Sequence, residues 1–186
     1  MRRYFHLTAI LLVIAFVAGT LISPIPVMGA TAAEINRDAK TALEKLYAKS
    51  PAATKLGEKA KVILVFPGIT KGGFMVGGQF GEGALLKGGK TAGYYNTVQV
   101  SYGFQAGVQK YGYALFLMTD SAVKWIDKSD GWEIGTGPSI VVMDTGAATS
   151  ASTTTLQSEI YAFFFDQKGL MGGLGLQGTK ITKIKK

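Results

Sequence analysis

The spacing of apolar residues divides the chain into a helical segment and a longer segment with the period of β-strands. Apolar side chains recur at helical spacing between residues 33 and 47, which predicts an amphipathic helix. Thr31 and Glu34 stand three residues apart at its start, as in a capping box. A second, short helix is predicted from Ser50, because the proline after it suits a first helical position, to about Lys61. The apolar positions of the first helix are Ile35, Ala39, Ala42, Leu43, Leu46 and Tyr47.

From Val62 onward the period changes to two. The clearest signal runs from Thr97 to Gln109, where apolar and polar residues alternate throughout. This alternation predicts one strand with a buried apolar face and a polar face. Val62 to Phe66 is expected to form a short buried strand that ends at Pro67. The apolar positions of the alternating segment are Val98, Val100, Tyr102, Phe104, Ala106 and Val108.

The remaining segments continue the series of strands. Continuous apolar runs at residues 111–118 and 160–165 suit strands that are covered on both faces. The two glycines at 88–89 predict a hairpin turn, and a short helix is expected over residues 121–128, capped by one of the two residues before it. Further strands are predicted at residues 73–86, as one broken strand or two, and at 132–144, 170–176 and 179–185.

These elements predict an α+β fold. Eight to ten strands behind a helical N-terminus imply a strongly bent antiparallel β-sheet, barrel-like or a sandwich, with N-terminal helices and one short internal helix. Glycine makes up 25 of the 186 residues, nearly twice its usual share, which suits tight bends and close approach between backbones.

The first 32 residues have the pattern of an export signal. Two arginines near the start are followed by an uncharged apolar run from Leu7 to Ile22, then by prolines and small residues. We predict a signal peptide over residues 1–32, with cleavage after Ala32 slightly preferred over cleavage after Ala30. An uncleaved membrane anchor is the alternative, although the run falls short of the ~20 residues needed to span a bilayer.

Residues 33–186 are then predicted to form a single domain in the periplasm or associated with the cell envelope. The chain has no cysteine, and its one histidine, His6, lies within the predicted signal. The exported part therefore lacks the thiol and imidazole groups on which disulfide scaffolds, most zinc sites and Ser-His-Asp or Cys-His catalysis depend. We expect no metal, no cofactor and no enzymatic activity.

A series of short motifs follows the predicted strands in a fixed order. The motifs are Ala60-Lys61, Val65-Phe66-Pro67, Lys71-Gly72-Gly73-Phe74, Gly77-Gly78, Gly81-Glu82-Gly83, Tyr94-Tyr95, Ser101 to Gly107, Phe116 to Asp120, Gly131-Trp132, Gly169-Leu170-Met171 and Gly178 to Ile181. Each motif is weak alone, but the ordered set resembles the SYLF domain from about Ile35 to Ile184. The export signal makes the chain similar to the secreted bacterial members of that family.

The resemblance implies a lipid-binding role. Eukaryotic SYLF domains bind phosphoinositides and other anionic lipids, and yeast members also bind and bundle actin. For an exported protein the resemblance implies an anionic phospholipid membrane surface as the partner, with actin unlikely in this compartment and no nucleic acid expected. The formal charge of +8 is opposite in sign to that of such a surface. Each lysine placed near an anionic bilayer contributes about 1 kcal/mol of binding free energy.

Two groups of lysines are candidates for the lipid contact. We expect them to share one face of the folded domain; the alternative for each is a solvated surface that keeps the protein soluble. The first group is Lys55, Lys59, Lys61 and Lys71, and the second is Lys180 and Lys183, followed by Lys185 and Lys186.

Two other functions remain open on the sequence alone. An outer-membrane β-barrel is suggested by export and by the alternation at residues 97–109, although the N-terminal helix and the two continuous apolar strands oppose it. A soluble carrier that holds a hydrophobic molecule inside a bent sheet is the other alternative.

Overall fold

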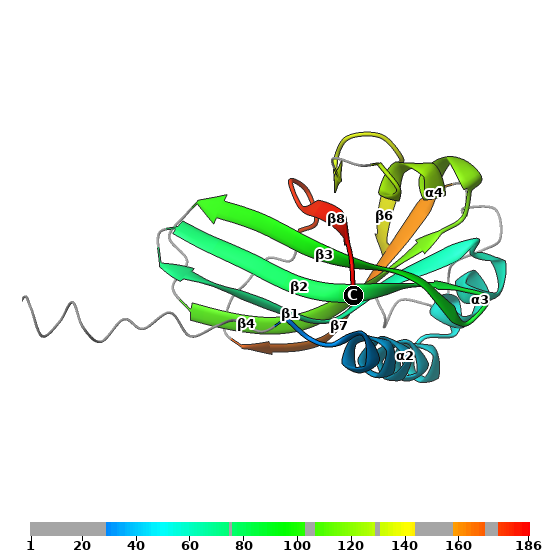
Figure 1. The fold of residues 1–186 in the computed structure, drawn as a ribbon, viewed down its shortest axis with the longest axis horizontal. Coiled ribbons are helices and arrows are strands. Elements are labelled where there is room, and N and C mark those ends of the chain that lie inside the picture. The colour runs from blue at the N-terminus through cyan, green and yellow to red at the C-terminus, as the bar shows by residue number, and fades with distance from the viewer. Residues whose placement is uncertain (1–28, 75, 103–106, 129–130, 144–157, 170–174) are drawn as a thin grey trace, which may run out of the picture.

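The computed structural model describes residues 29–74, 76–102, 107–128, 131–143, 158–169 and 175–186. This part of the chain forms three helices and one eight-stranded sheet that curls into a half-barrel (Figure 1). The helices are α2 (Ala32–Lys49), α3 (Pro51–Lys59) and α4 (Asp120–Ile126). The strands are β1 (Val62–Phe74), β2 (Val76–Lys87), β3 (Lys90–Tyr102), β4 (Gly107–Leu117), β5 (Trp132–Glu133), β6 (Ile140–Met143), β7 (Ile160–Gly169) and β8 (Lys180–Ile184).

The sheet confirms the predicted α+β class with a strongly bent sheet. Its strand order is β5-β8-β3-β2-β1-β4-β7-β6, and every neighbouring pair is antiparallel except β6 and β7, which are parallel. The sheet is therefore mixed, which the sequence did not predict. Two consecutive glycines with positive φ, Gly88 and Gly89, form the predicted hairpin turn between β2 and β3, as a two-residue turn of this hand requires.

The helix starts follow local sequence signals. Thr31 and Glu34 form the predicted capping box at the start of α2. Ser50 accepts a hydrogen bond from the backbone of Ala53 at the start of α3, and the hydroxyl of Thr119 caps α4 in the same way. The predicted apolar face of α2 is buried from Ile35 to Leu46. These ends could be predicted because each cap depends on residues three positions apart.

The curled sheet separates two hydrophobic cores. On its inner face, side chains of β1, β4 and β7 pack with α4 in a core that includes Leu64, Leu115 and Trp132. On its outer face, α2 and α3 cover a second core that includes Val65, Phe116 and Phe163. β4 and β7 contribute alternate residues to both cores, so the predicted strands covered on both faces are confirmed.

Two strand predictions were wrong. Pro67 does not end the first strand, because β1 continues to Phe74 through a bulge that lies between Val65 and Gly68 in its pairing with β2. Residues 97–109 do not form one strand: they span the end of β3 and the start of β4, and residues 103–106 between them lie outside the described part.

The predicted side of burial in the alternating segment was also wrong. Val98, Val100 and Val108 are exposed on the outer face, whereas Thr97 and Gln109 on the inner face are buried. Hydrogen bonds compensate the buried polar groups in part: the hydroxyl of Tyr113 donates to Thr97 Oγ1 at 2.8 Å. Val98, Val100 and Val108 therefore belong to neither core, and Phe104 and Ala106 lie outside the described residues.

The predicted signal peptide lies largely outside the described residues, which begin at position 29. Within the described part, none of the helices has the length and apolar character required to cross a bilayer. The strand predicted at residues 170–176 falls mostly on positions outside the described part, and residues 132–144 contain two short strands rather than one.

Candidate functional site

The outer face of the sheet carries a row of side chains that runs across six strands. The cross-strand register places Val98 of β3 opposite both Lys180 of β8 and Phe80 of β2. Thr70 of β1 links Phe80 to β4. The complete row, in strand order, is Lys180, Val98, Phe80, Thr70, Lys110 and Lys168. It therefore has an apolar centre with one amine at one end and two at the other.

The two lysines at the β7 end of this row are direct cross-strand neighbours. Lys110 of β4 lies opposite Lys168 of β7, and both side chains are exposed. Like charges in this position destabilise a sheet slightly. In the part of the chain that the structure describes, neither amine lies within 4 Å of a carboxylate. The pair thus retains its positive charge at the surface.

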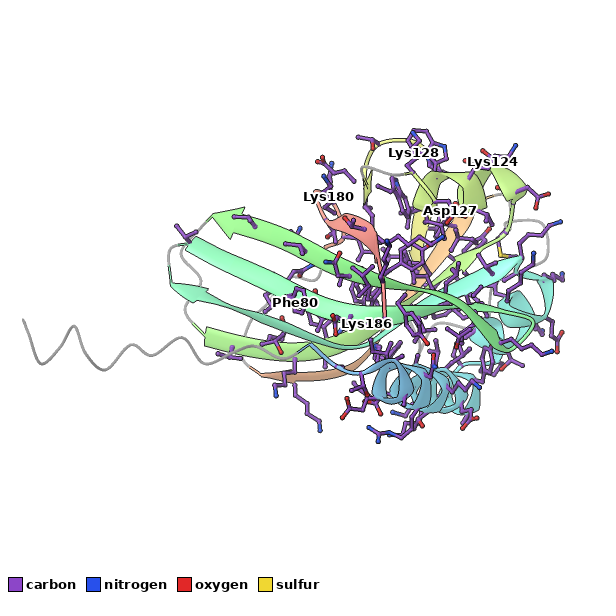
Figure 2. All side chains as sticks on the ribbon, viewed as in Figure 1. Phe80, Lys124, Asp127, Lys128, Lys180 and Lys186 are labelled. Carbon is purple, nitrogen blue, oxygen red and sulfur yellow. The ribbon has the colours of Figure 1, made fainter. Side chains whose placement is uncertain are left out.

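Lys180, at the other end of the row, is a predicted site residue. Its amine also has no carboxylate within 4 Å among the described residues, although Glu133 of β5 is its cross-strand neighbour. Figure 2 shows Lys180 at the start of β8 and Phe80 on the stretch of the sheet that extends beyond α2. Lys180 is the one predicted lysine that belongs to this row.

Lys183 lies on the same strand but on the opposite face. Its amine donates to Asp127 Oδ1 at 2.8 Å, and the hydroxyl of Tyr95 donates to the same oxygen at 3.0 Å. The hydrogen bond from Lys183 holds the pKa of Asp127 below its ordinary value, with a smaller contribution from Tyr95. Burial, followed by the bond to Asp127, raises the pKa of Tyr95. This cluster joins α4 to the sheet and neutralises Lys183.

The first predicted group of lysines is divided by the fold. Lys55 and Lys59 are exposed on α3, and Lys61 follows that helix and pairs with Asp120 at 3.5 Å. Lys71 lies on the inner face of β1, with only 8% of its surface exposed. The structure therefore does not bring this group together on one surface.

Lys71 lies within a layer of buried polar side chains on the inner face. Its cross-strand neighbours are Gln79 of β2 and Gln109 of β4, each only 4% exposed. Tyr111 donates a hydrogen bond to Gln79 Oε1, and Gln79 donates to Thr179 Oγ1 at 3.4 Å. Burial raises the pKa of Tyr111 to about 12, so its hydroxyl remains a donor at neutral pH. This layer holds the curled sheet together from inside.

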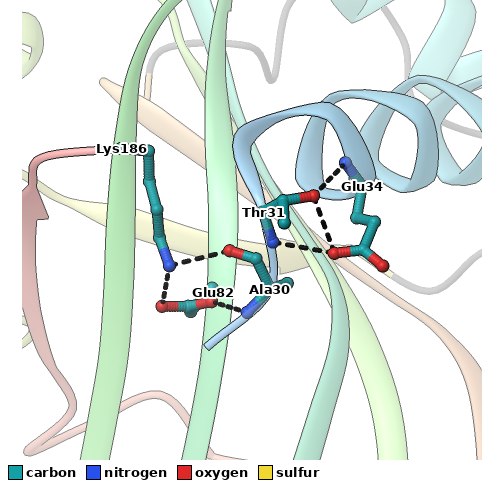
Figure 3. A network of polar contacts seen from close by, with 5 residues as sticks. All are labelled: Ala30, Thr31, Glu34, Glu82 and Lys186. Atoms are coloured by element: carbon teal, nitrogen blue, oxygen red, sulfur yellow. Dashed lines mark hydrogen bonds and ion pairs between the residues drawn. The ribbon is translucent and has the colours of Figure 1, made fainter. Parts of the chain in front are cut away.

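Lys186, at the end of the second predicted group, joins both ends of the described chain to β2. Its amine lies 2.8 Å from Glu82 Oε1 and donates to the carbonyl of Ala30 at 2.8 Å, while the Ala30 N–H donates to Glu82 Oε2 at 2.9 Å (Figure 3). The Glu82 and Lys186 side chains are only 13% and 16% exposed. Lys186 is thus neutralised beside the start of α2, and either predicted cleavage site would remove Ala30 from this network.

Sequence reasoning missed Lys110 and Lys168. Both stand apart from the lysine-rich stretches of the sequence, and the structure brings them together by pairing β4 with β7. One signal was available: Lys110 is two residues from Val108, so the outward-facing series of the alternating segment continues through it. A search for runs of charge does not detect a pair formed by strand register.

Comparison with known protein families found a match. A family model described as Ysc84, Las17-binding protein actin regulator, matches residues 98–186. This match supports assignment of the chain to the SYLF domain family. The match begins within β3 and includes Lys110, Lys168 and Lys180, whereas β1 and β2 precede it. No curated protein matches the chain.

The described residues offer no cluster of three His, Cys, Asp or Glu side chains that could hold a metal ion. A groove of about 480 Å³ lies between α2 and the sheet, where Ile35 and Asp38 face Thr70 and Phe80. A second hollow, of about 450 Å³, is lined by residues that include Ile134, Val142 and Leu176. The first groove borders the row of side chains that crosses the sheet.

Proposed function

We propose that this chain is a non-enzymatic exported protein that binds anionic phospholipid surfaces through basic side chains on a β-rich scaffold. The match to the SYLF family supports a lipid- or actin-related binding role. The family model names an actin regulator, but the predicted export signal favours a lipid surface over actin. Anionic phospholipid is the partner whose charge is opposite to that of the exposed row.

The observation that carries this proposal is the uncompensated pair of Lys110 and Lys168. Two amines held opposite each other cost stability, so a surface with no partner for them would be more stable with one of them replaced. Lipid phosphates compensate such a pair, because anionic headgroups attract each nearby amine by about 1 kcal/mol. Lys180 adds a third amine across the apolar centre of the row.

Sedimentation with lipid vesicles tests the proposal. The purified protein is expected to pellet with vesicles that contain phosphatidylglycerol and to stay in the supernatant with pure phosphatidylcholine vesicles. Binding is expected to weaken as salt rises, since exposed charges are screened. Equal pelleting with both vesicle types, or pelleting that does not respond to salt, would reject electrostatic recruitment.

Charge reversal locates the surface. The double substitution Lys110→Glu with Lys168→Glu is expected to lower binding to anionic vesicles at least tenfold, because it removes two attractions and adds two repulsions. The matched control reverses Lys55 and Lys59, two exposed lysines of α3 that lie outside the row. Equal losses in the two double variants would show that net charge, rather than this row, determines binding.

Carriage of a hydrophobic small molecule is a second candidate function, and the hollow of about 450 Å³ beside Ile134 and Leu176 favours it. Native mass spectrometry tests it: a carrier would retain a lipid monomer in that hollow. A protein that carries no lipid after purification, and takes up none when lipid monomer is added, would eliminate this function.

A further inference from the structure

The outer face of the sheet beyond α2 presents a group of large apolar side chains to solvent. Strands β1 to β4 extend well past the helices in Figure 1, and none of the described helices covers the outer face there. Soluble proteins rarely expose contiguous apolar surface without a function for it. We call this group the bare face; its members and exposed fractions are Val76 57%, Phe80 46%, Val98 39%, Val100 59% and Val108 62%.

Strand register makes the bare face continuous. Val98 lies directly opposite Phe80, and the next row contains Val100, Gly78, Gly72 and Val108 in strand order. Its two central positions are glycines, so no side chain rises between the valines at its ends. The two glycines thus form a shallow area, two strands wide, with apolar side chains on either side of it.

The opposite face of the same strands shows that the outward apolar pattern is not a packing error. Gln79 and Gln109 are buried on the inner face, where a core would ordinarily place apolar residues. Turning the apolar side chains inward would have provided a conventional core. The sequence keeps them outside and buries polar groups instead, and Gln109 Oε1 has no hydrogen-bond partner among the described residues. This costly arrangement indicates that the outer apolar surface meets an apolar partner.

The charges at the border of the bare face identify that partner. Lys110 and Lys168 flank its β4 side and Lys180 its β8 side, all three exposed and without a carboxylate within 4 Å in the described part. An apolar centre between amines complements the boundary of an anionic bilayer, where acyl chains lie beneath negative headgroups. Long lysine side chains can keep their amines at the phosphates while apolar neighbours enter the acyl region. A second copy of this chain would instead present the same positive border.

We infer that the bare face inserts its apolar side chains shallowly into the acyl boundary of an anionic bilayer, with Lys110, Lys168 and Lys180 at the headgroup phosphates. This inference rests on the proposed function and adds an apolar contact to it. The domain then docks on the outer face of its sheet, and the rigid pairing of β1 to β4 sets how deep Phe80 and Val100 enter.

A tryptophan placed on the bare face reports its depth. The emission of the introduced tryptophan is obtained by subtracting the emission of the unsubstituted protein from that of Phe80→Trp. It is expected to shift to the blue when phosphatidylglycerol vesicles are added, and to be quenched when the acyl chains of the vesicles are brominated. The matched control is Val141→Trp, because Val141 of β6 is 42% exposed but lies opposite Tyr161, in the half of the outer face that the helices cover. Its emission is expected to stay unchanged.

Truncation of an apolar side chain measures the contribution of insertion. Val100→Ser is expected to weaken vesicle binding about fivefold, in a way that added salt does not abolish, whereas Val141→Ser leaves binding unchanged. If the Lys110 and Lys168 double reversal weakens binding while Phe80→Trp is not quenched and Val100→Ser binds normally, insertion is overturned and electrostatic binding stands. If the unsubstituted protein does not bind anionic vesicles at all, the proposed function itself fails.

Discussion

The outer face of the sheet has two halves that differ in what covers them. Near α2 and α3, Ala84 and Phe116 are fully buried. Further along the same face, Phe80 is 46% exposed and Val100 is 59% exposed. The same strands build both halves, and their side chains alternate in the same way. The comparison teaches that alternation decides which face a side chain lies on, whereas the position of the helices decides whether that face is core or surface.

The largest expected difference between the halves is in stability. Phe116→Ala is expected to lower the free energy of unfolding by about 3–5 kcal/mol, because it empties a site packed against Phe163. Phe80→Ala, on the same face in the uncovered half, is expected to cost about 1 kcal/mol or less. Urea unfolding of both variants measures the pair. Equal losses would mean that the two halves do not differ as described.

The boundary between the halves is the next test. Glu82 lies on the outer face of β2 between Ala84 and Phe80, and binds Lys186 in a largely covered pair. Glu82→Gln is expected to destabilise the fold by about 1–3 kcal/mol, because it leaves the Lys186 amine without its carboxylate. Thermal unfolding measures the loss. Glu133→Gln, at an exposed position with no ion pair in the described part, is the control and is expected to leave stability unchanged.

The two halves also show which features of the fold could be predicted from the sequence and which could not. The caps of α2, α3 and α4 were predicted correctly because each depends on neighbouring residues. The prediction that Val98 and Val100 are buried was wrong, because the alternation of apolar and polar residues is the same whichever face of the strand is covered. The helices that cover one half, α2 and α3, precede all of these strands in the sequence, so no local signal in the strands marks where their cover ends.

The candidate site shows the same limit. Lys180 was predicted, but Lys183 is neutralised by Asp127 and Lys71 is buried. Lys110 and Lys168 lie 58 positions apart in sequence and become neighbours only through the pairing of β4 with β7. Pairing of distant strands and of distant charges depends on topology, which the sequence pattern does not specify.

A single substitution can separate stability from binding in the uncovered half. Lys110→Glu places opposite charges across β4 and β7, so it is expected to stabilise the fold by about 0.2–1 kcal/mol. The same change is expected to weaken binding to anionic vesicles. Denaturant unfolding and vesicle sedimentation of one preparation measure both effects. A variant that gains stability and binds as before would identify the lysines as a merely solvated surface.

The smallest expected effect concerns the inner face and serves as a contrast. Because the pKa of Asp127 is lowered in the folded state, its stabilising contribution is present above the ordinary carboxyl pKa of about 4 and is lost as pH falls through the folded-state value. Both partners are about half exposed, so the contribution is expected to be below about 1 kcal/mol. Asp127→Asn should flatten the pH dependence of stability below pH ~4. An unchanged pH profile would assign acid sensitivity to other carboxyls.

Protection of an introduced thiol by vesicles tests the central claim most directly, because the chain has no cysteine of its own. The account predicts that Val100→Cys reacts much more slowly with a charged, water-soluble thiol reagent when phosphatidylglycerol vesicles are added, while Val141→Cys reacts at an unchanged rate. Equal protection of the two thiols, or protection of position 141 alone, would contradict docking through the bare face.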